Sequence, residues 1–228
     1  DPTQAEKPCM RRHQSGFTLI EIAIVLVIIG LLLGGILKGQ ELITSARVRN
    51  LVNQIDGTKA AFFGFQDRYR ALPGDFTLAT TQVPNATQNG NGDGQITGTE
   101  SIALWDHLSH AGFINGTYVY NPVESDATTP RNPYGAFIQV IFDAEYQGTA
   151  ATPATARHNM KTGPQIPVDI LAEIDRKTDD GLANSGSMRF SAYAAGGVAP
   201  VAGNCFDAGT GRWSAGNGQT NCGAAILF

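Results

Sequence analysis

Residues 89–100 carry oxygen-bearing side chains at a spacing that suits a divalent cation. The stretch reads NGNGDGQITGTE. A twelve-residue calcium loop takes its ligands from positions 1, 3, 5, 7, 9 and 12, and glycine makes the sharp turn at position 6. Gly94 holds that sixth position, and Ile96 follows as the apolar anchor. The six ligand positions are held by Asn89, Asn91, Asp93, Gln95 (through its backbone carbonyl), Thr97 (directly or through water) and Glu100. The spacing therefore predicts calcium as a cofactor.

Two features keep another interpretation open. The first position is Asn89 and not an aspartate, so only two formal negative charges face the ion. Pro84 lies shortly before the loop, which argues against a helix that enters it, although a helix is predicted over residues 100–111, with Gly112 after it. The stretch is also typical of a Gly/Asn-rich turn ahead of an N-capped helix. If calcium binds, the low charge predicts an affinity in the sub-millimolar to millimolar range.

Two further groups of side chains suggest chemistry less strongly. Asp175, Asp179 and Asp180 lie at the end of a helix predicted over residues 167–177. A solvated turn is the favoured interpretation; a cation or a basic partner is the alternative, because acids oppose the dipole at a helix C-terminus. His107 and His110 are three residues apart without an evident third ligand, so surface or supporting roles are favoured over a metal pair.

The chain carries no pattern that predicts an enzyme. It has no Ser-His-Asp motif, no phosphate-binding loop and no CxxC pair. The net charge of −4 gives no basic surface for nucleic acid. We therefore expect a structural or binding protein.

The element that anchors the chain is an apolar run from Phe17 to Leu37 that contains one acid, Glu21. As a helix the run would span about 31 Å, enough for the hydrocarbon core of a bilayer. Lys7, Arg11 and Arg12 precede it. The positive-inside rule then keeps this end in the cytoplasm and exports the C-terminal body. A carboxylate inside a membrane span is rare and points to a function.

The helical pattern continues beyond the apolar run. Apolar residues recur at three- and four-residue steps up to Tyr69, and Pro73-Gly74 then stops the helix. We predict one helix from Phe17 to Tyr69. Its first half is apolar on all sides, and its second half presents one apolar stripe that a globular body can cover.

The run RRHQSGFTLIEIAIVLVIIG closely resembles the class III signal of type IV pilins and of the pseudopilins of type II secretion. The resemblance implies that a prepilin peptidase cleaves between Gly16 and Phe17 and that Phe17 is then N-methylated. It also implies that Glu21 meets the new amine of a neighbouring subunit, because two buried opposite charges offset much of each other's desolvation cost. The alternative for Glu21 is an acid that is tolerated near a helix start because the helix dipole favours it.

The same resemblance predicts where the chain resides and what it meets. The subunit would first sit in the inner (cytoplasmic) membrane with its head outside the cytoplasm. An assembly platform would then pack it with other copies or related pilin subunits into a periplasmic or extracellular filament. One departure concerns the proline that many type IV pilins carry just after the apolar segment. Lys38 stands there, after Gly34-Gly35, and should reach the membrane interface.

Of the three cysteines, one lies in the predicted leader and two lie in the predicted head. Residues 1–16 read as a leader that is removed, and Met10 is its plausible start. Cys9 therefore falls outside the mature protein. Cys205 and Cys222 remain, and in an exported protein such a pair is typical of a disulfide. Two free thiols are the alternative.

The sequence predicts an α+β fold, in which a long N-terminal helix packs on an antiparallel sheet as in pilins. Strands are expected at residues 136–142, 188–193, 204–207 and 224–228, and residues 148–163 read as a mobile or surface-binding loop. The expected organisation is a leader (1–16), a transmembrane and filament-core helix (17–37), its amphipathic continuation (38–70) and a globular head (71–228).

Three functions fit these features. The first is a structural subunit of a type IV pilus-like or pseudopilus filament. The second is a minor tip pilin that acts as an adhesin or substrate-binding module. The third is a membrane-anchored calcium-binding domain that does not polymerise.

Overall fold

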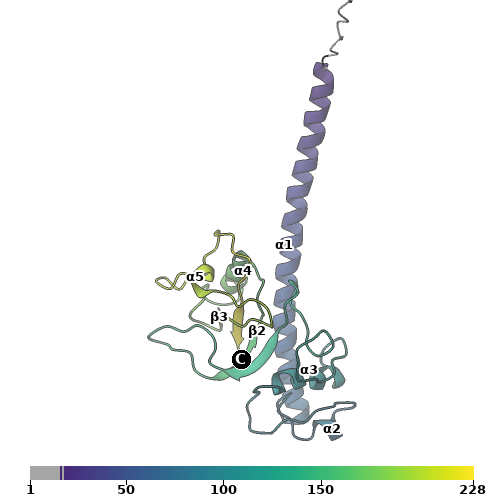
Figure 1. The fold of residues 1–228 in the computed structure, drawn as a ribbon, viewed down its shortest axis with the longest axis vertical. Helices are drawn as coiled ribbons and strands as arrows, with labels where there is room; N and C mark the ends of the chain where they lie inside the picture. The colour runs from purple at the N-terminus through teal and green to yellow at the C-terminus, as the bar shows by residue number, and fades with distance from the viewer. Residues whose placement is uncertain (1–15, 17) are drawn as a thin grey trace, which may run out of the picture. The chain divides into compact units, whose positions relative to one another are not determined.

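The computed structural model describes Gly16 and residues 18–228 (Figure 1). The chain divides into two compact units, one ending at Thr44 and one that comprises Ser45–Phe228. Helix α1, Leu19–Tyr69, contributes to both units. Its residues in the first unit are exposed except for the half-buried Gly39, and one face of its part in the second unit supplies one side of a hydrophobic core.

The second unit is built on a four-stranded sheet. The strands are β1 (Gln139–Asp143), β2 (Arg157–Lys161), β3 (Met188–Phe190) and β4 (Ala224–Leu227). Their order is β1-β2-β4-β3, and every pair of neighbours is antiparallel. The α+β, pilin-like layout predicted from the sequence is therefore confirmed.

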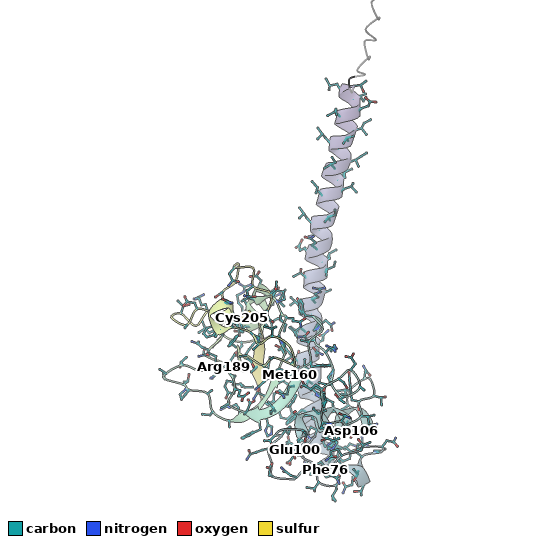
Figure 2. All side chains as sticks on the ribbon, in the orientation of Figure 1. Phe76, Glu100, Asp106, Met160, Arg189 and Cys205 are labelled. Carbon is teal, nitrogen blue, oxygen red and sulfur yellow. A yellow bond between two sulfur atoms is a disulfide. The ribbon has the colours of Figure 1, made fainter. Side chains whose placement is uncertain are left out.

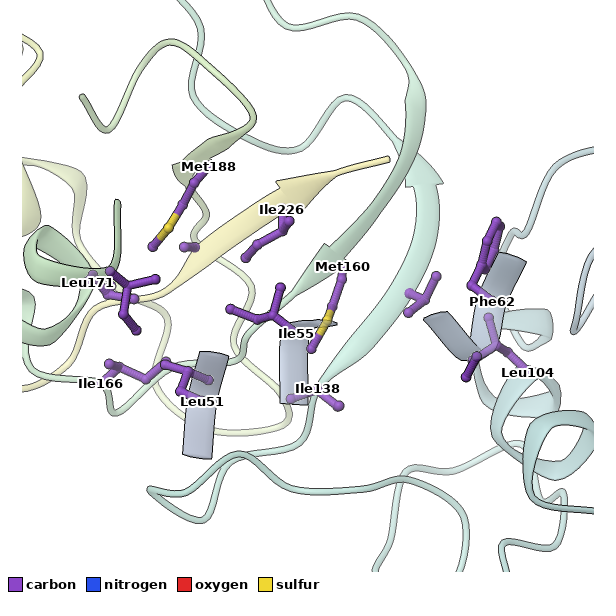
Figure 3. Packing of buried hydrophobic residues seen from close by; sticks show 14 of the residues in the cluster. Leu51, Ile55, Phe62, Leu104, Ile138, Met160, Ile166, Leu171, Met188 and Ile226 are labelled. Carbon is purple, nitrogen blue, oxygen red and sulfur yellow. The ribbon is translucent and has the colours of Figure 1, made fainter. Parts of the chain in front are cut away.

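One row of side chains crosses the sheet and faces α1. The strand register aligns Val140, Met160, Ile226 and Met188, and all four are at most 4% exposed. Ile55 lies near Met160 and Ile226 in Figure 3, Leu51 lies nearer to Ile166, and all of them belong to one core cluster. The apolar residues of the second half of α1 recur at helical spacing, so one face of it is buried. Successive strand residues point to opposite faces of the sheet, and β4 is buried on both faces, with Ala225 and Leu227 in a second, smaller cluster.

Shorter helices surround this core. They are α2 (Ala79–Gln82), α3 (Glu100–His110), α4 (Val168–Thr178) and α5 (Ala202–Cys205). Phe62 of α1 lies near Leu104 of α3 in Figure 3, so α3 covers the C-terminal part of α1. α3 and α4 begin and end within one residue of the predicted helices, because each carries a stripe of apolar residues and a glycine after its end.

Two expectations about the sheet were wrong. The sequence predicts a mobile or surface-binding loop over residues 148–163, but their second half forms β2, a central strand whose last three residues are buried. Residues 204–207 were predicted as a strand, but the chain forms α5 there and Phe206 only bridges to Trp213. In β2, tertiary contacts override the weak strand preference of the polar sequence RHNMK.

Candidate functional site

The predicted processing site falls at the edge of the described residues. Gly16 is exposed, and Phe17 lies outside the described residues. The calcium-loop residues, the cysteines and Glu21 can all be located.

Glu21 closes a capping box at the start of α1. Thr18 precedes the first helical residue, and its backbone N–H and its Oγ1 hydroxyl both donate to Glu21 Oε2, at 2.7 and 2.8 Å. In return, the Glu21 N–H donates to Thr18 Oγ1 at 3.3 Å. This reciprocal pairing satisfies backbone donors that a helix start leaves unpaired. The T-x-x-E motif at residues 18–21 is the sequence signal for this capping box, in addition to the charge and the dipole that suit an acid here.

The large apolar side chains of α1 up to Ile43 are all exposed in the isolated chain. Among the described residues, α1 is the one helix long and apolar enough to cross a membrane. Its most apolar window has a mean hydropathy of 2.9, and none of that window is buried. Gly34, Gly35 and Lys38 are all helical, and Lys38 Nζ pairs with Glu41 Oε2 at 2.6 Å. The helix therefore continues through the position where many pilins carry proline.

The predicted calcium loop is joined by a carboxylate that its spacing did not include. Oxygen atoms of Asp75, Asp93 and Glu100 lie within 4.8 Å of one another. Asp75 is 5% exposed, and its carboxylate accepts backbone N–H groups of the loop. Its Oδ1 accepts from Gly92 (2.6 Å) and Asp93 (3.1 Å), and its Oδ2 accepts from Gly94 (2.9 Å).

The loop residues themselves are held in a compact turn. Asn91 Oδ1 accepts from the Asp93 N–H at 2.8 Å, and Asp93 Oδ1 accepts from the Gln95 N–H at 2.8 Å. Glu100 Oε1 accepts from the Asn91 N–H at 2.9 Å, and Oε2 accepts from the Thr97 N–H at 3.0 Å. Gly94 has φ +82°, the left-handed conformation that the sixth position requires.

Asn89, the predicted first ligand, has another partner. Its Oδ1 accepts the Thr80 N–H of α2 at 2.9 Å. Asp75 thus adds a third carboxylate to the group that the structure brings together. No local sequence pattern links Asp75 to residues 89–100. The stretch Pro73-Gly74-Asp75 after the long helix predicts only a turn.

The loop is attached firmly to the rest of the second unit. Ile96 is 0% exposed, and its carbonyl accepts the Phe142 N–H of β1 at 2.7 Å. On the other side, His107 Nδ1 accepts the Gly74 N–H at 2.9 Å, and His107 Nε2 lies 2.7 Å from the Gln88 carbonyl oxygen. His107 therefore joins the residue before Asp75 to the residue before Asn89. Glu100 and Asp106, on the same helix as His107, are labelled in Figure 2.

His107 does not lie at the surface, and both of its ring nitrogens lie within hydrogen-bond distance of backbone groups, which is a supporting role. His107 is 0% exposed, and burial lowers its pKa even though the hydrogen bond to the Gln88 carbonyl raises it. His110 Nδ1 lies 2.7 Å from Asp106 Oδ1. The signal that could have identified His107 is its place on the apolar side of α3, beside Ala103 and Leu104.

The acidic group after α4 is not simply a solvated turn. Asp175 is 0% exposed, and its Oδ2 accepts the Trp213 indole N–H at 2.6 Å. Burial raises the pKa of the Asp175 carboxyl from 3.8 to about 6, although that hydrogen bond lowers it. Carboxylate oxygens of Asp175, Asp179 and Asp180 lie within 4.8 Å of one another.

The predicted disulfide is present. Cys205 and Cys222 are bonded, 17 residues apart, and both are fully buried. The bond ties α5 to the segment that leads into β4. A closed loop of this length stabilises the fold by about 3 kcal/mol in the chain-entropy model.

A comparison with known families identifies the N-terminal segment. Residues 11–37 match the prokaryotic N-terminal methylation motif, the class III prepilin signal of type IV pilins and pseudopilins. Neither a curated protein nor a solved structure matches the chain. Together with the long apolar helix and the antiparallel sheet, this motif supports a type IV pilin- or pseudopilin-like protein. The motif implies processing by a prepilin peptidase and assembly with other pilin subunits, and it suggests a structural protein.

Proposed function

We propose that this chain is a structural subunit of a type IV pilus-like or pseudopilus filament, cleaved between Gly16 and Phe17 and assembled through α1. The observation that carries the proposal is the methylation motif on a helix whose apolar residues are all exposed up to Thr44. Apolar surface of this extent is stable only when lipid or other helices cover it. The membrane covers it before assembly, and neighbouring α1 helices cover it in the filament.

Glu21 sets the register of assembly in this proposal. Its carboxylate, held at the helix start by Thr18, meets the positively charged amine that cleavage creates on Phe17 of a neighbouring subunit. An unpaired carboxylate in the apolar filament core would cost several kcal/mol, so subunits in the wrong register are disfavoured. The capping box and the ion pair are separate roles, and substitutions can separate them.

Three variants in cells with an active prepilin peptidase test this role. Glu21→Gln keeps the capping box, since glutamine serves at that position, but removes the charge. Thr18→Ala weakens the cap and keeps the charge, and Glu21→Ala removes both. We expect filaments from Thr18→Ala but few or none from the two Glu21 variants. Normal filaments from Glu21→Gln, with loss in Thr18→Ala, would assign Glu21 a capping role only.

The processing step has its own measurement. Mass spectrometry of the mature chain should give a start at methylated Phe17, and Gly16→Val should leave the leader attached because a bulky residue replaces the glycine at the cleavage site. A mature chain with another N-terminus contradicts the family role itself. The amount of this subunit in purified filaments then separates a main structural subunit from a minor one.

We also propose that the loop of residues 89–100 binds calcium with Asp75 as an additional ligand. Oxygen ligands from Asp75, Asp93 and Glu100 suit a hard cation, and Asn91 lies within hydrogen-bond distance of Asp93. None of the ion pairs among the described residues involves these three carboxylates. Calcium would therefore neutralise a group of like charges that the fold holds together.

The test is the thermal stability of the full-length chain in detergent, with EDTA or with millimolar calcium. We expect calcium to raise the melting temperature, and Asp93→Asn and Glu100→Gln to reduce that rise. Asp126→Asn serves as a matched control, because Asp126 is an exposed acid outside the loop. Equal calcium responses in the loop variants and in the control would exclude the site.

A further inference from the structure

The acidic group at the end of α4 has a buried oxygen atom without a partner. Asp175 is fully buried, and its Oδ2 is committed to the Trp213 indole N–H. Its Oδ1 is also buried and has no hydrogen-bond partner of good geometry among the described residues, although the Gly181 backbone N–H lies close enough to lower the pKa of the carboxyl. A buried carboxylate oxygen in this state costs free energy unless a donor or a cation reaches it. Asp175 Oδ1 is therefore a buried acceptor that a bound cation would stabilise.

Two more carboxylates converge on the same place. Oxygen atoms of Asp175, Asp179 and Asp180 lie within 4.8 Å of one another. Asp179 and Asp180 follow the last turn of α4, where the helix dipole adds further negative potential. Three carboxylates and a helix C-terminus thus concentrate negative charge around one small volume.

The side chains nearby do not neutralise this charge. None of the ion pairs between described residues includes any of the three aspartates. Lys177, in the last turn of α4, pairs with Glu173 instead, and Arg176 is exposed. Lys59 of α1 is influenced by the charge of Asp179, but it lies beyond ion-pair distance. Among the residues that the structure describes, no cationic side chain pairs directly with these three carboxylates, so a bound cation would supply the positive charge.

The outer two carboxylates are already oriented. Asp179 Oδ2 accepts the N–H groups of Ser187 (2.6 Å) and Met188 (2.9 Å) at the start of β3. Asp180 accepts the Leu182 N–H on Oδ1 at 2.8 Å and the Ser185 hydroxyl on Oδ2 at 2.6 Å. These bonds fix the carboxylates in place and leave further lone pairs on each oxygen. A cation could bind without ordering the loop, so little entropy would be lost on binding.

We propose that Asp175, Asp179 and Asp180 form a second divalent-cation site that binds calcium at the junction of α4 and β3. Carboxylate oxygens are hard ligands, which favour calcium or magnesium over softer metals. Calcium is favoured over magnesium because the carboxylates come from one side of a short turn, whereas magnesium demands a near-ideal octahedron. Water completes the coordination on the exposed side, next to Asp180. The site would fasten α4 to β3 and Trp213.

The experiment uses the full-length chain in detergent micelles and removes the other proposed site. A background carrying Asp93→Asn and Glu100→Gln disables the loop of residues 89–100. Calcium titrations then follow the melting temperature, and terbium luminescence follows binding directly. The Trp213 indole is hydrogen-bonded to Asp175, so excited Trp213 should transfer energy efficiently to a bound terbium ion. Calcium should displace that ion and quench the emission.

Two variants and one matched control test whether the calcium response comes from the three aspartates. Asp175→Asn retains an oxygen acceptor for Trp213 and removes the charge, so the fold should persist. Asp180→Asn alters an exposed carboxylate. Glu173→Gln removes one negative charge from the same helix, outside the group of three. In the background chain we expect calcium to raise the melting temperature by about 5 °C or more at saturation.

The outcomes separate a cation site from a purely structural one. With a cation site, Asp175→Asn and Asp180→Asn weaken calcium binding at least tenfold, and Glu173→Gln does not. A background chain without any calcium or terbium response overturns the proposal. So does equal affinity in Asp175→Asn, Asp180→Asn and Glu173→Gln. The proposal is also overturned if Asp175→Asn leaves the melting temperature in calcium unchanged or raises it. That result would indicate a structural role for a protonated Asp175.

Discussion

Asp75 should stabilise the loop of residues 89–100 even without a metal ion. Its buried carboxylate accepts three backbone N–H groups, from Gly92, Asp93 and Gly94. Asp75→Asn is the sharpest perturbation, because asparagine has nearly the same shape but only one acceptor oxygen. That oxygen can keep the bonds from Gly92 and Asp93, whereas its amide group then faces the Gly94 N–H, donor against donor.

The size of the effect follows from these contacts. A hydrogen bond to a charged group contributes about 1.5–3 kcal/mol, and a buried N–H left without a partner costs about 1–3 kcal/mol. The substitution weakens two charged bonds and breaks the third, so we expect a loss of about 3 kcal/mol. For a chain of this size, 1 kcal/mol shifts the melting temperature by about 2–4 °C. Asp75→Asn should therefore lower it by roughly 10 °C.

The assay is thermal unfolding of the full-length chain in detergent with EDTA, followed by circular dichroism. EDTA removes any contribution from a bound cation, so the shift reports the hydrogen bonds alone. Asp93→Asn is the control, because an asparagine can still accept the Gln95 N–H, and it should shift the temperature by no more than about 2 °C. If Asp75→Asn melts within about 2 °C of the unmodified chain in EDTA, the reasoning about Asp75 is refuted.

Three further predictions concern the second unit. Burial lowers the pKa of His107 below its usual 6.5, so stability is fully present above pH 6.5 and is lost as pH falls below it; His107→Gln should flatten this dependence in chemical denaturation. Leu51→Ala leaves a cavity under the sheet and should cost about 2–5 kcal/mol in the same assay. Reducing Cys205–Cys222 should cost about 3 kcal/mol, and Cys205→Ala with Cys222→Ala should then be insensitive to reductant.

Features that depend on local periodicity were predictable from the sequence. The long helix, α3 and α4 each follow a 3.6-residue apolar pattern that ends at proline or glycine. β1, β3 and β4 are apolar runs of the expected kind, although their bounds differ by a few residues. The disulfide was predictable from the number of cysteines together with the predicted export of the head.

Features that depend on distant contacts were not predictable in this way. β2 is polar along the chain, and only its central place between β1 and β4 makes it a strand. Asp75 is separated from Glu100 by α2, so no spacing pattern could include it among the loop's carboxylates. His107 is buried because it bridges Gly74 and Gln88, two segments whose proximity arises only in the folded unit.

Under the proposed function, Glu21 has two separate roles, one in the helix cap and one in the contact between subunits. In the isolated chain its Oε2 accepts both donors of Thr18, which fixes the start of α1 without any partner. Its Oε1 has no role in that capping box and remains available for the amine of a neighbouring subunit. The cap holds the carboxylate at the first turn, so the charge pair would form without ordering a flexible side chain. A glutamine can keep the capping box but cannot form the charge pair. For this reason the variants Glu21→Gln and Thr18→Ala together distinguish a helix cap from a filament contact.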